Sequence, residues 1–319
     1  MELIRSIQNL RSRHLGCVAT IGKFDGVHLG HKQILAQLTS QAKERHLPSL
    51  VILFEPHPAE FFIPDKAPVR LNSLTAKLKY LAEQKIDRVL CLKFNAALAS
   101  MTADQFIDDI LVGKLAVAHF VVGDDFRFGK GRSGTFEQLQ QQGAKLGFSV
   151  ENTISYKLEG TRVSSTEIRR ALADNDFARV KLLSDRAFSM IGRVMHGQAL
   201  GRTIGVPTAN VKTTRYKLPL TGVYAVIATL ENGQRFQAVA NLGVRPTVDG
   251  SKSVLEVHLF DFSDTIYGQK LSVEFQKFIR KEKKFADFDQ LKQAIFNDID
   301  VVKKYFATSP VMGMEKTNE

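Results

Sequence analysis

Apolar positions in the first half of the chain follow two alternating periods. Continuous apolar runs at 16–21, 49–54, 87–92 and 117–122 have the length of buried strands. Apolar residues recur at spacings of three and four over 31–43, 74–84, 102–111 and 136–146, which predicts helices, the third of them capped by Thr102. Strands that alternate with helices predict a parallel sheet with helices on both faces. Ligands of such sheets bind at the carboxyl ends of the strands, near a topological switch point.

The pattern changes after about residue 186. Strand-like segments now follow one another at 189–194, 222–230, 235–241, 254–260 and 271–278. Between two of them, Asn232 and Gly233 predict a type I′ hairpin turn with positive φ at both central residues. Apolar residues then step by three or four from Phe288 to Phe306, which predicts a final helix. The second half is therefore expected to be a small antiparallel β-barrel with a C-terminal helix.

This change of pattern divides the chain into three expected parts. An α/β domain spans 1–186, a barrel domain spans 187–308, and an aperiodic tail at 309–319 is expected to be disordered. A length of 319 residues suits two domains, and 44% apolar with 24% charged residues excludes general disorder. No apolar run is long enough for a membrane span or a signal peptide.

The net charge bears on the chemistry of the partners, and the cysteines bear on the cellular compartment. A formal net charge of +11 favours an anionic partner, which could be nucleic acid, an acidic membrane or a polyphosphate ligand. Cys17 and Cys91 both lie in apolar windows. They predict buried thiols of a reducing compartment, the cytoplasm, rather than a disulfide or a zinc site.

The first chemical pattern, Gly22-Lys-Phe-Asp-Gly-Val-His-Leu-Gly-His31, joins the first predicted strand to a helix. Its glycines, Gly22, Gly26 and Gly30, let the backbone turn and approach a ligand closely. The helix N–H groups and the positive dipole end attract an anion. His28 and His31 add donors or cations that suit a phosphoryl group under attack. A zinc site and a plain exposed loop are the alternatives, although His-x2-His lacks the neighbouring Glu of a metalloprotease.

A second pattern, Val163-Ser-Ser-Thr-Glu-Ile-Arg169, opens a later helix. Ser164, Ser165 and Thr166 can cap that helix and present hydroxyls, while Arg169 lies one turn further at the same end. Hydroxyls, helix N–H groups and a guanidinium together bind phosphates. A capped helix with a surface arginine is the alternative.

A third pattern, Gly201-Arg-Thr-Ile-Gly-Val-Pro-Thr-Ala-Asn210, lies in the β half. Gly201 and Gly205 form a loop that could wrap phosphates. Thr208 and Asn210, two residues apart, project on one side of an extended segment and offer hard oxygen ligands for Mg²⁺. A glycine-rich hairpin with incidental polar groups fits these residues as well, and Glu256 in an alternating strand could be a base or a solvent-facing side chain.

The N-terminal motifs resemble the HxGH signature of the α/β nucleotidyltransferase superfamily, in the form of its flavin adenylyltransferase branch. Phe54-Glu-Pro-His-Pro58, Val122–Gly129 and Val163–Arg169 follow in the order of that branch. The resemblance implies that Phe24 and Asp25 join the glycines and hydroxyls at the ATP site. It also implies flavin contacts from Phe62, Asp125 and Phe128. Glu55 and Lys23 depart from the usual pattern, in which Asp and Asn are commoner.

The third pattern resembles the signature of riboflavin kinase. Segments 221–224, 241–247, 255–261, 266–268 and 278–285 follow in the family order. The two halves together resemble the prokaryotic bifunctional riboflavin kinase/FAD synthetase family. This implies phosphorylation of riboflavin with MgATP in the C-terminal half, with Glu256 rather than Glu274 as general base and Thr208 and Asn210 at the metal. It implies transfer of AMP from a second ATP to FMN in the N-terminal half, with His28, His31, Ser164 and Arg169 stabilising the transition state.

Two alternative functions also fit the sequence. In one, only one module is active. In the other, the charge of +11 marks a flavin- or nucleic-acid-binding protein, for which a steep salt dependence of DNA binding would be the sign. No helix-turn-helix, zinc-finger or RRM-type signature supports that alternative, so we expect riboflavin, FMN and ATP as partners, without nucleic acid or membrane. Self-association is left open.

Overall fold

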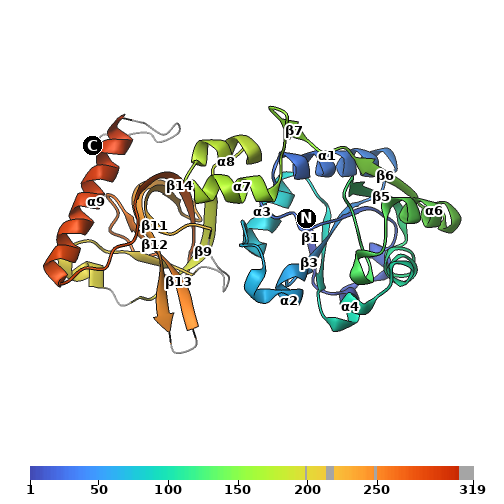
Figure 1. Cartoon of the computed structure of the whole chain (residues 1–319), viewed down its shortest axis with the longest axis horizontal. Coiled ribbons are helices and arrows are strands. Elements are labelled where there is room, and N and C mark those ends of the chain that lie inside the picture. The colour runs from blue at the N-terminus through green and yellow to red at the C-terminus, as the bar shows by residue number, and fades with distance from the viewer. Residues whose placement is uncertain (198–199, 213–218, 248–249, 309–319) are drawn as a thin grey trace. The chain divides into compact units, whose positions relative to one another are not determined.

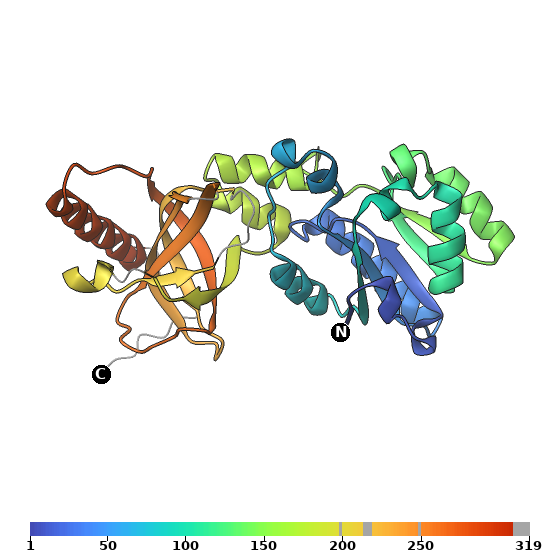
Figure 2. The same cartoon turned by 90° about the horizontal axis from the view of Figure 1, so that it is seen from below.

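The computed structural model describes residues 1–197, 200–212, 219–247 and 250–308 and separates into two compact units (Figures 1 and 2). The first unit comprises Met1–Pro68 and Lys77–Ser165, and the second comprises Val69–Ala76 and the chain from Thr166 onwards. The expected domain boundary at 186 stays a prediction. The expected disordered tail at 309–319 lies outside the described residues.

The first unit is built on a six-stranded parallel sheet with the order β1-β4-β3-β2-β5-β6. Its strands are β1 Glu2–Ile4, β2 Cys17–Ile21, β3 Ser49–Glu55, β4 Arg88–Lys93, β5 Val117–Gly123 and β6 Ser149–Thr153. The chain moves from β2 to one side through β3 and β4, and returns to the other side of β2 as β5. The loops after β2 and β5 therefore lie at the topological switch point, where a ligand was expected.

Helices cover both faces of this sheet, as predicted. Helix α1 (Leu29–Glu44) packs on β2, β3, β5 and β6 and buries Leu35, Leu38 and Ala42. The other face carries the core cluster that includes Cys17, Ile52 and the helical segment η4 (Phe106–Lys114). The further helices before residue 165 are α2 Pro58–Phe62, α3 Leu74–Glu83, α4 Ala96–Ser100, α5 Ala103–Gln105 and α6 Phe136–Leu146. Short 3-10 turns lie at Ile7–Asn9, Ser12–His14, Pro64–Lys66 and Lys130–Arg132. Strands β7 Lys157–Leu158 and β8 Thr161–Arg162 form a small hairpin.

The helix predicted over 102–111 begins as expected but changes its winding. Thr102 caps it by accepting a hydrogen bond from the Gln105 N–H at 3.1 Å. From Phe106 onwards the turns widen to a π-helix, which extends to Lys114. The wider turns keep four apolar side chains buried in the sheet core, Phe106, Ile107, Ile110 and Leu111.

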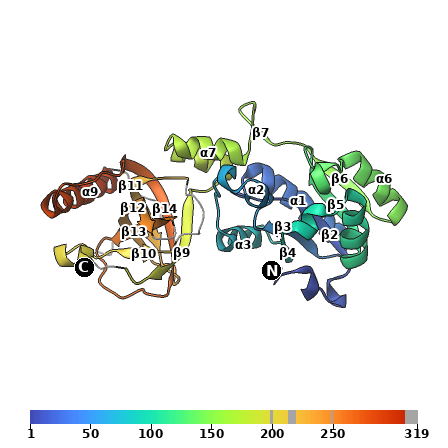
Figure 3. The same cartoon turned by 60° about the horizontal axis from the view of Figure 1, so that its bottom comes forward.

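The second unit contains a closed antiparallel barrel with the order β10-β13-β12-β11-β14-β9 (Figure 3). Its strands are β9 Ser189–Met195, β10 Ala209–Val211, β11 Gly222–Thr229, β12 Arg235–Thr247, β13 Gly250–Leu259 and β14 Lys270–Arg280. Helices α7 (Ser165–Ala173) and α8 (Phe177–Ser184) precede the barrel, and η6 (Leu200–Ile204) precedes β10. Helix α9 (Phe288–Thr308) packs on the barrel through Ile299, Val302 and Phe306. The predicted barrel with a C-terminal helix is confirmed.

The turn between β11 and β12 differs from the prediction. The Leu230 carbonyl accepts a hydrogen bond from the Gly233 N–H at 3.1 Å, and Gly233 has a φ of 89° whereas Asn232 has no positive φ. The predicted type I′ turn is therefore wrong. A three-residue loop forms instead, with glycine at the left-handed position that such loops require. The Asn232 side chain supports it by accepting a hydrogen bond from the Gln234 N–H at 3.0 Å.

Candidate active sites

The loop after β2 brings the two predicted histidines together. Helix α1 begins two residues earlier than predicted, with His28 as its N-cap, whose Nδ1 accepts a hydrogen bond from the His31 N–H at 3.3 Å. The two imidazole rings stack with centroids 3.7 Å apart, and the Phe24 ring lies 5.1 Å from that of His31. His28 is only 6% exposed. Both imidazoles and the helix N-terminus thus form one cluster at the carboxyl end of the central strand.

The backbone of this loop is strained. Phe24 has a φ of 45° and Val27 a φ of 39°, in the left-handed region that favours glycine, and Gly26 lies between them at 86°. Each such non-glycine residue costs about 1–3 kcal/mol, and the cost is highest for a β-branched side chain such as valine. Both side chains are fully buried, which offsets part of that strain.

Close packing explains two of the predicted glycines. A Cβ on Gly22 would lie 2.9 Å from the Phe24 ring, closer than real Cβ contacts. A Cβ on Gly30 would lie 3.3 Å from the His28 ring and 3.4 Å from the Val163 carbonyl oxygen. Larger residues at these positions would therefore move the histidine cluster.

The start of α7 meets the same loop. The Ser165 hydroxyl donates a hydrogen bond to the Asp25 carbonyl at 2.7 Å, and Asp25 is buried. The structure thus brings the segment that contains Ser165 against the loop that contains Asp25, so the first two predicted phosphate patterns meet. Ser164 directly precedes Ser165 in the chain. Thr166 and Arg169 belong to the second unit, where the Arg169 Nε donates to the Val69 carbonyl at 2.6 Å.

Two of the predicted flavin contacts are aromatic rings in very different surroundings. Phe62 on α2 is 60% exposed, and its ring meets those of Phe61 and Phe94 edge-on at 5.3 and 5.6 Å. Phe128 is 7% exposed, belongs to the sheet core and stacks on Phe126 at 5.3 Å. The Phe62 ring is therefore accessible to a ligand, whereas the Phe128 ring is packed in the core of the sheet.

The third predicted flavin contact, Asp125, lies in the loop after β5 at the switch point. Its carboxylate accepts a hydrogen bond from Arg162 at 3.0 Å. The neighbouring Asp124 accepts from the Ser155 hydroxyl at 2.7 Å. Partial burial raises the pKa of Asp124, but the Ser155 hydrogen bonds and the Arg162 charge outweigh it, so that pKa lies below its ordinary value. Both carboxylates are thus tied to the β7–β8 hairpin.

Four of the five residues predicted for the kinase half lie around one cavity of the barrel unit, and Gly205 is not part of its lining. The cavity has a volume of about 310 Å³, a size that suits a small-molecule ligand, and lies between the barrel wall and the first turns of α9. It is lined by four of the predicted residues, Gly201, Thr208, Asn210 and Glu256. Thr208 and Asn210 do face the same space, as their two-residue spacing predicted.

Strand register explains why these polar groups meet. Glu256 on β13 pairs with Asn210 on β10 and with Asn241 on β12. Asn241 in turn pairs with Val223 on β11, and Val223 pairs with Arg280 on β14. These five residues all line the cavity, and we call them the barrel row. Asn241 and Arg280 were not predicted as site residues, although both belong to segments that resemble riboflavin kinase.

Arg280 is held at the cavity by an ion pair. Its Nε and Nη2 donate to the two carboxylate oxygens of Asp298 on α9 at 2.8 and 2.7 Å, and its guanidinium lies 5.7 Å from the centre of the Phe285 ring. Such bidentate pairs are geometrically specific. The pair fixes α9 to the last strand of the barrel. Glu274, the other candidate base, accepts instead from the Gln276 amide at 2.6 Å, away from the cavity lining.

His258 also lines the cavity and holds the segment that carries Thr208 and Asn210. Its Nδ1 donates to the Pro207 carbonyl at 2.7 Å. Burial lowers the pKa of His258; the Pro207 hydrogen bond opposes that shift and the Lys303 charge adds to it. The ring is therefore neutral at neutral pH, with its proton on Nδ1.

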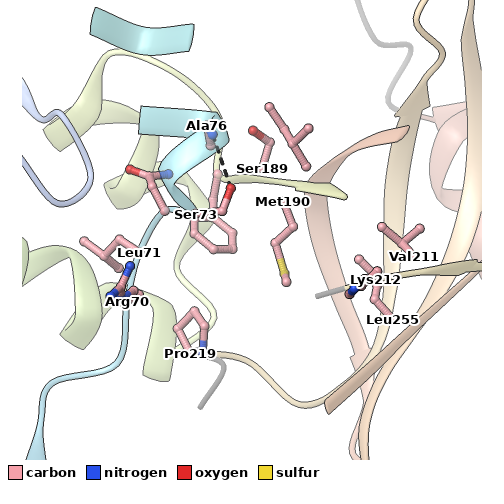
Figure 4. Close-up of a pocket in the computed structure, with 13 residues that line it drawn as sticks. Arg70, Leu71, Ser73, Ala76, Ser189, Met190, Val211, Lys212, Pro219 and Leu255 are labelled. Carbon is pink, nitrogen blue, oxygen red and sulfur yellow. Dashed lines mark hydrogen bonds between the residues drawn. The ribbon is translucent and has the colours of Figure 1, made fainter. Parts of the chain in front are cut away.

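A second hollow of the barrel unit lies between residues 70–76 and β9 (Figure 4). Its volume of about 30 Å³ holds a water molecule or two and no nucleotide.

Within the described ranges, no group of three or more His, Cys, Asp and Glu side chains could hold a metal ion. None of the helices in those ranges is both long and apolar enough to cross a membrane.

The fold and both sites define the class of protein. A parallel sheet with a histidine loop at its switch point is the architecture of an α/β nucleotidyltransferase, and the chain continues into a barrel whose cavity is lined by Thr208, Asn210 and Glu256. A family model described as FAD synthetase matches residues 10–167, and one described as riboflavin kinase matches residues 184–306.

Curated relatives agree over nearly the whole chain. A bifunctional riboflavin kinase/FMN adenylyltransferase of Pseudomonas fluorescens is 49% identical, with 97% of this chain and 99% of that protein covered. Proteins of the same description from Haemophilus influenzae and Escherichia coli K12 are each 47% identical to this chain. Each match covers 96% of this chain, with 99% of the Haemophilus protein and 98% of the Escherichia protein. The chain belongs to the bifunctional riboflavin kinase/FMN adenylyltransferase family and is an enzyme with both transferase modules.

A solved structure supports the fold. A crystal structure described as a macrolide-efflux protein from Streptococcus pneumoniae matches with a TM-score of 0.77 at 28% identity, covering 95% of this chain and 99% of that one.

Proposed function

We propose that the two reactions of this family occur at the two constellations described above, with the roles that follow. The observation that carries this proposal is the convergence of each set of motifs. Residues 22–31 and 163–165 meet at the switch point of the sheet, and Thr208, Asn210 and Glu256 meet at one barrel cavity. Riboflavin is phosphorylated in the barrel unit, and the resulting FMN is adenylylated at the sheet.

At the sheet site, the FMN phosphate attacks the α-phosphorus of ATP. A new P–O bond forms, the bond to the bridging oxygen breaks, and pyrophosphate leaves. His28, His31 and the N–H groups of α1 stabilise the negative charge that builds on the α-phosphoryl oxygens. Ser164 and Ser165 bind the phosphates of the leaving group. The step uses no protein nucleophile.

The flavin of FMN lies beside the loops at the switch point. Phe62 has the exposed face that ring stacking requires. Phe128 contributes to the flavin site through the stacked pair of rings that it forms with Phe126. Asp125, tied to Arg162, supplies a polar contact to the flavin.

At the barrel site, Glu256 takes the proton of the ribityl 5′-hydroxyl as its oxygen attacks the γ-phosphorus of ATP, and ADP leaves. Gly201 and Gly205 let the preceding loop wrap the phosphates. Thr208, Asn210 and Glu256 line one cavity with hard oxygen atoms, so the donor set fits Mg²⁺, which Thr208 and Asn210 would hold. When bound, the ion would neutralise phosphate charge. Asn241, which pairs with Glu256 in the barrel row, lines the same cavity.

A flavin time course tests both assignments. The protein is incubated with riboflavin, ATP and Mg²⁺, and flavins are separated by chromatography. FMN should appear first and FAD later. His28→Ala should stop FAD formation and leave FMN formation intact, whereas Glu256→Gln should stop FMN formation and leave the conversion of supplied FMN to FAD. Loss of both activities in each variant would contradict two separate sites.

The same proposal places the enzyme in the cytoplasm with small-molecule partners only. Cys17 is fully buried, and burial raises its pKa to about 12, which suits a thiol that stays reduced. The positive charge serves phosphate-rich substrates rather than nucleic acid. A salt titration on duplex DNA should show no binding at physiological salt, and a steep fall of log K with log salt would contradict this.

A further inference from the structure

Lys77 is a buried cation that lies outside every motif of the sequence. It is 7% exposed, and its Nζ donates a hydrogen bond to the Lys23 carbonyl at 2.6 Å. Ser73 caps α3 by accepting a hydrogen bond from the Ala76 N–H at 3.2 Å (Figure 4). Helix α3 begins at Leu74, so Lys77 belongs to its first turn. Burial disfavours an ammonium ion, and the positive end of the helix dipole adds to that penalty. The role of this lysine can be read from the group that its ammonium binds, the Lys23 carbonyl.

That role follows from what the ammonium holds. Lys23 begins the strained turn after β2, and two of the turn's carbonyls are fixed by side chains from elsewhere in the first unit. Lys77 binds the carbonyl of Lys23, and the Ser165 hydroxyl binds the carbonyl of Asp25 at 2.7 Å. Phe24, whose φ is 45°, lies between these two carbonyls. The two side chains therefore hold the backbone on both sides of the strained residue.

We propose that Lys77 is a positioning residue for adenylyl transfer. By holding the Lys23 carbonyl, it keeps the turn in the conformation that presents His28 and His31 to the α-phosphate. It acts through the loop backbone, and the assignment rests on the proposed function of the sheet site. Misplacement of catalytic groups by about 1 Å costs up to roughly a hundredfold in rate, so the loss of this contact should be visible in turnover.

The test compares three variants by both activities. Lys77→Met removes charge and donor, Lys77→Gln keeps an amide donor, and Lys79→Met alters an exposed lysine of the same helix as control. We expect Lys77→Met to lower the kcat of FAD formation from FMN by roughly tenfold to a hundredfold, with a smaller effect on the KM for ATP. Lys77→Gln should recover part of that loss. Lys79→Met should leave both activities unchanged, and riboflavin kinase activity should be unchanged in all three.

The outcomes separate this inference from the function on which it rests. His28→Ala is measured in parallel. If that variant loses FAD formation while Lys77→Met keeps it within twofold, the role of Lys77 is overturned and the site stands. If His28→Ala keeps FAD formation, the proposed site itself is wrong. Equal losses in Lys77→Met and Lys77→Gln, at unchanged thermal midpoints, would assign the effect to charge and overturn positioning through the hydrogen bond.

Discussion

Several side chains of the two sites are anchored on backbone atoms rather than on one another. His28 accepts from the His31 N–H, Ser165 donates to the Asp25 carbonyl, and His258 donates to the Pro207 carbonyl. Such contacts fix the path of a loop, so a substitution acts on the residues that the loop carries. For His258 these residues are Thr208 and Asn210.

His258 should make the barrel sensitive to acid. Burial holds its folded pKa below the ordinary value of about 6.5, so its contribution to stability is present above that pH. As the pH falls through the folded pKa, the unfolded state already binds the proton and that contribution is lost. We expect the thermal midpoint of the wild type to fall between pH 7 and 5 more than that of His258→Asn. The exposed His196→Asn is the control, and an equal fall in all three would contradict the prediction.

Cys17 should not react with thiol reagents in the folded enzyme. The side chain is fully buried and its pKa is raised to about 12 by that burial, so almost no thiolate exists at pH 8. Labelling with a chromogenic disulfide should modify Cys17 only after denaturant is added. Mass analysis of the labelled peptides checks this, and rapid labelling of Cys17 in the native enzyme would contradict the described packing of β2.

At the scale of elements, the glycine loop before β10 offers a matched pair of substitutions. A Cβ on Gly201 would overlap the Val206 carbonyl oxygen, and the Gly201 carbonyl already accepts from the Val206 N–H at 2.8 Å. Gly201→Ala must therefore shift the backbone that leads to Thr208. A Cβ on Gly205 meets nothing within 4 Å, although its φ of 76° costs alanine about 1 kcal/mol.

We therefore expect Gly201→Ala to lower riboflavin kinase activity by at least about tenfold and Gly205→Ala by much less. Initial rates of FMN formation measure the difference. FAD formation from supplied FMN should be unchanged in both variants, because it occurs in the other unit, and the thermal midpoint of each variant serves as the control for folding of the barrel. Equal kinase losses in the two variants would show that the loop tolerates the displaced carbonyl.

The elements found from sequence were those with long apolar signals. The interior strands and the stripe from Phe288 to Phe306 stand out because burial demands continuous or periodic apolar residues. Strands β1 and β10, each three residues long, carry too little pattern, and the edge strand β6 is largely polar. Helix α8 was missed as well.

Motif residues of the candidate sites could be predicted from sequence for a similar reason, since glycine, histidine and hydroxyl patterns are local in sequence. Asn241 and Arg280 join the site only through strand register, which links residues far apart in the chain. Lys77 would be taken from sequence alone for a solvated helix lysine. Its burial depends on tertiary packing around the Lys23 carbonyl.

At the scale of the whole molecule, helix α8, which precedes the predicted boundary at 186, packs against strands of the barrel. Phe177 on α8 packs its ring against Phe275 and Tyr224, with centroids 6.2 and 6.0 Å away. The Tyr224 hydroxyl also lies 3.3 Å from the Asn175 side-chain oxygen. A fragment that begins at residue 187 loses these contacts.

A fragment of residues 166–319 should therefore be more stable than one of residues 187–319. Removal of a buried phenylalanine costs about 3–5 kcal/mol, so the longer fragment should melt several degrees higher. Thermal unfolding of both fragments, with Phe177→Ala in the longer one as the matched control, measures this. Equal midpoints for the two fragments would support the boundary at 186 instead.

The division into two units has a consequence for the balance of flavin nucleotides. One chain carries one copy of each module, so expression raises or lowers both catalysts in a fixed one-to-one proportion. At given concentrations of riboflavin and ATP, the ratio of FMN to FAD that the enzyme delivers then depends on the two sets of rate constants. Because each unit has its own core, a substitution that slows one module can shift that ratio while the other keeps its rate. Selection on the supply of each cofactor can thus act on a single polypeptide one half at a time.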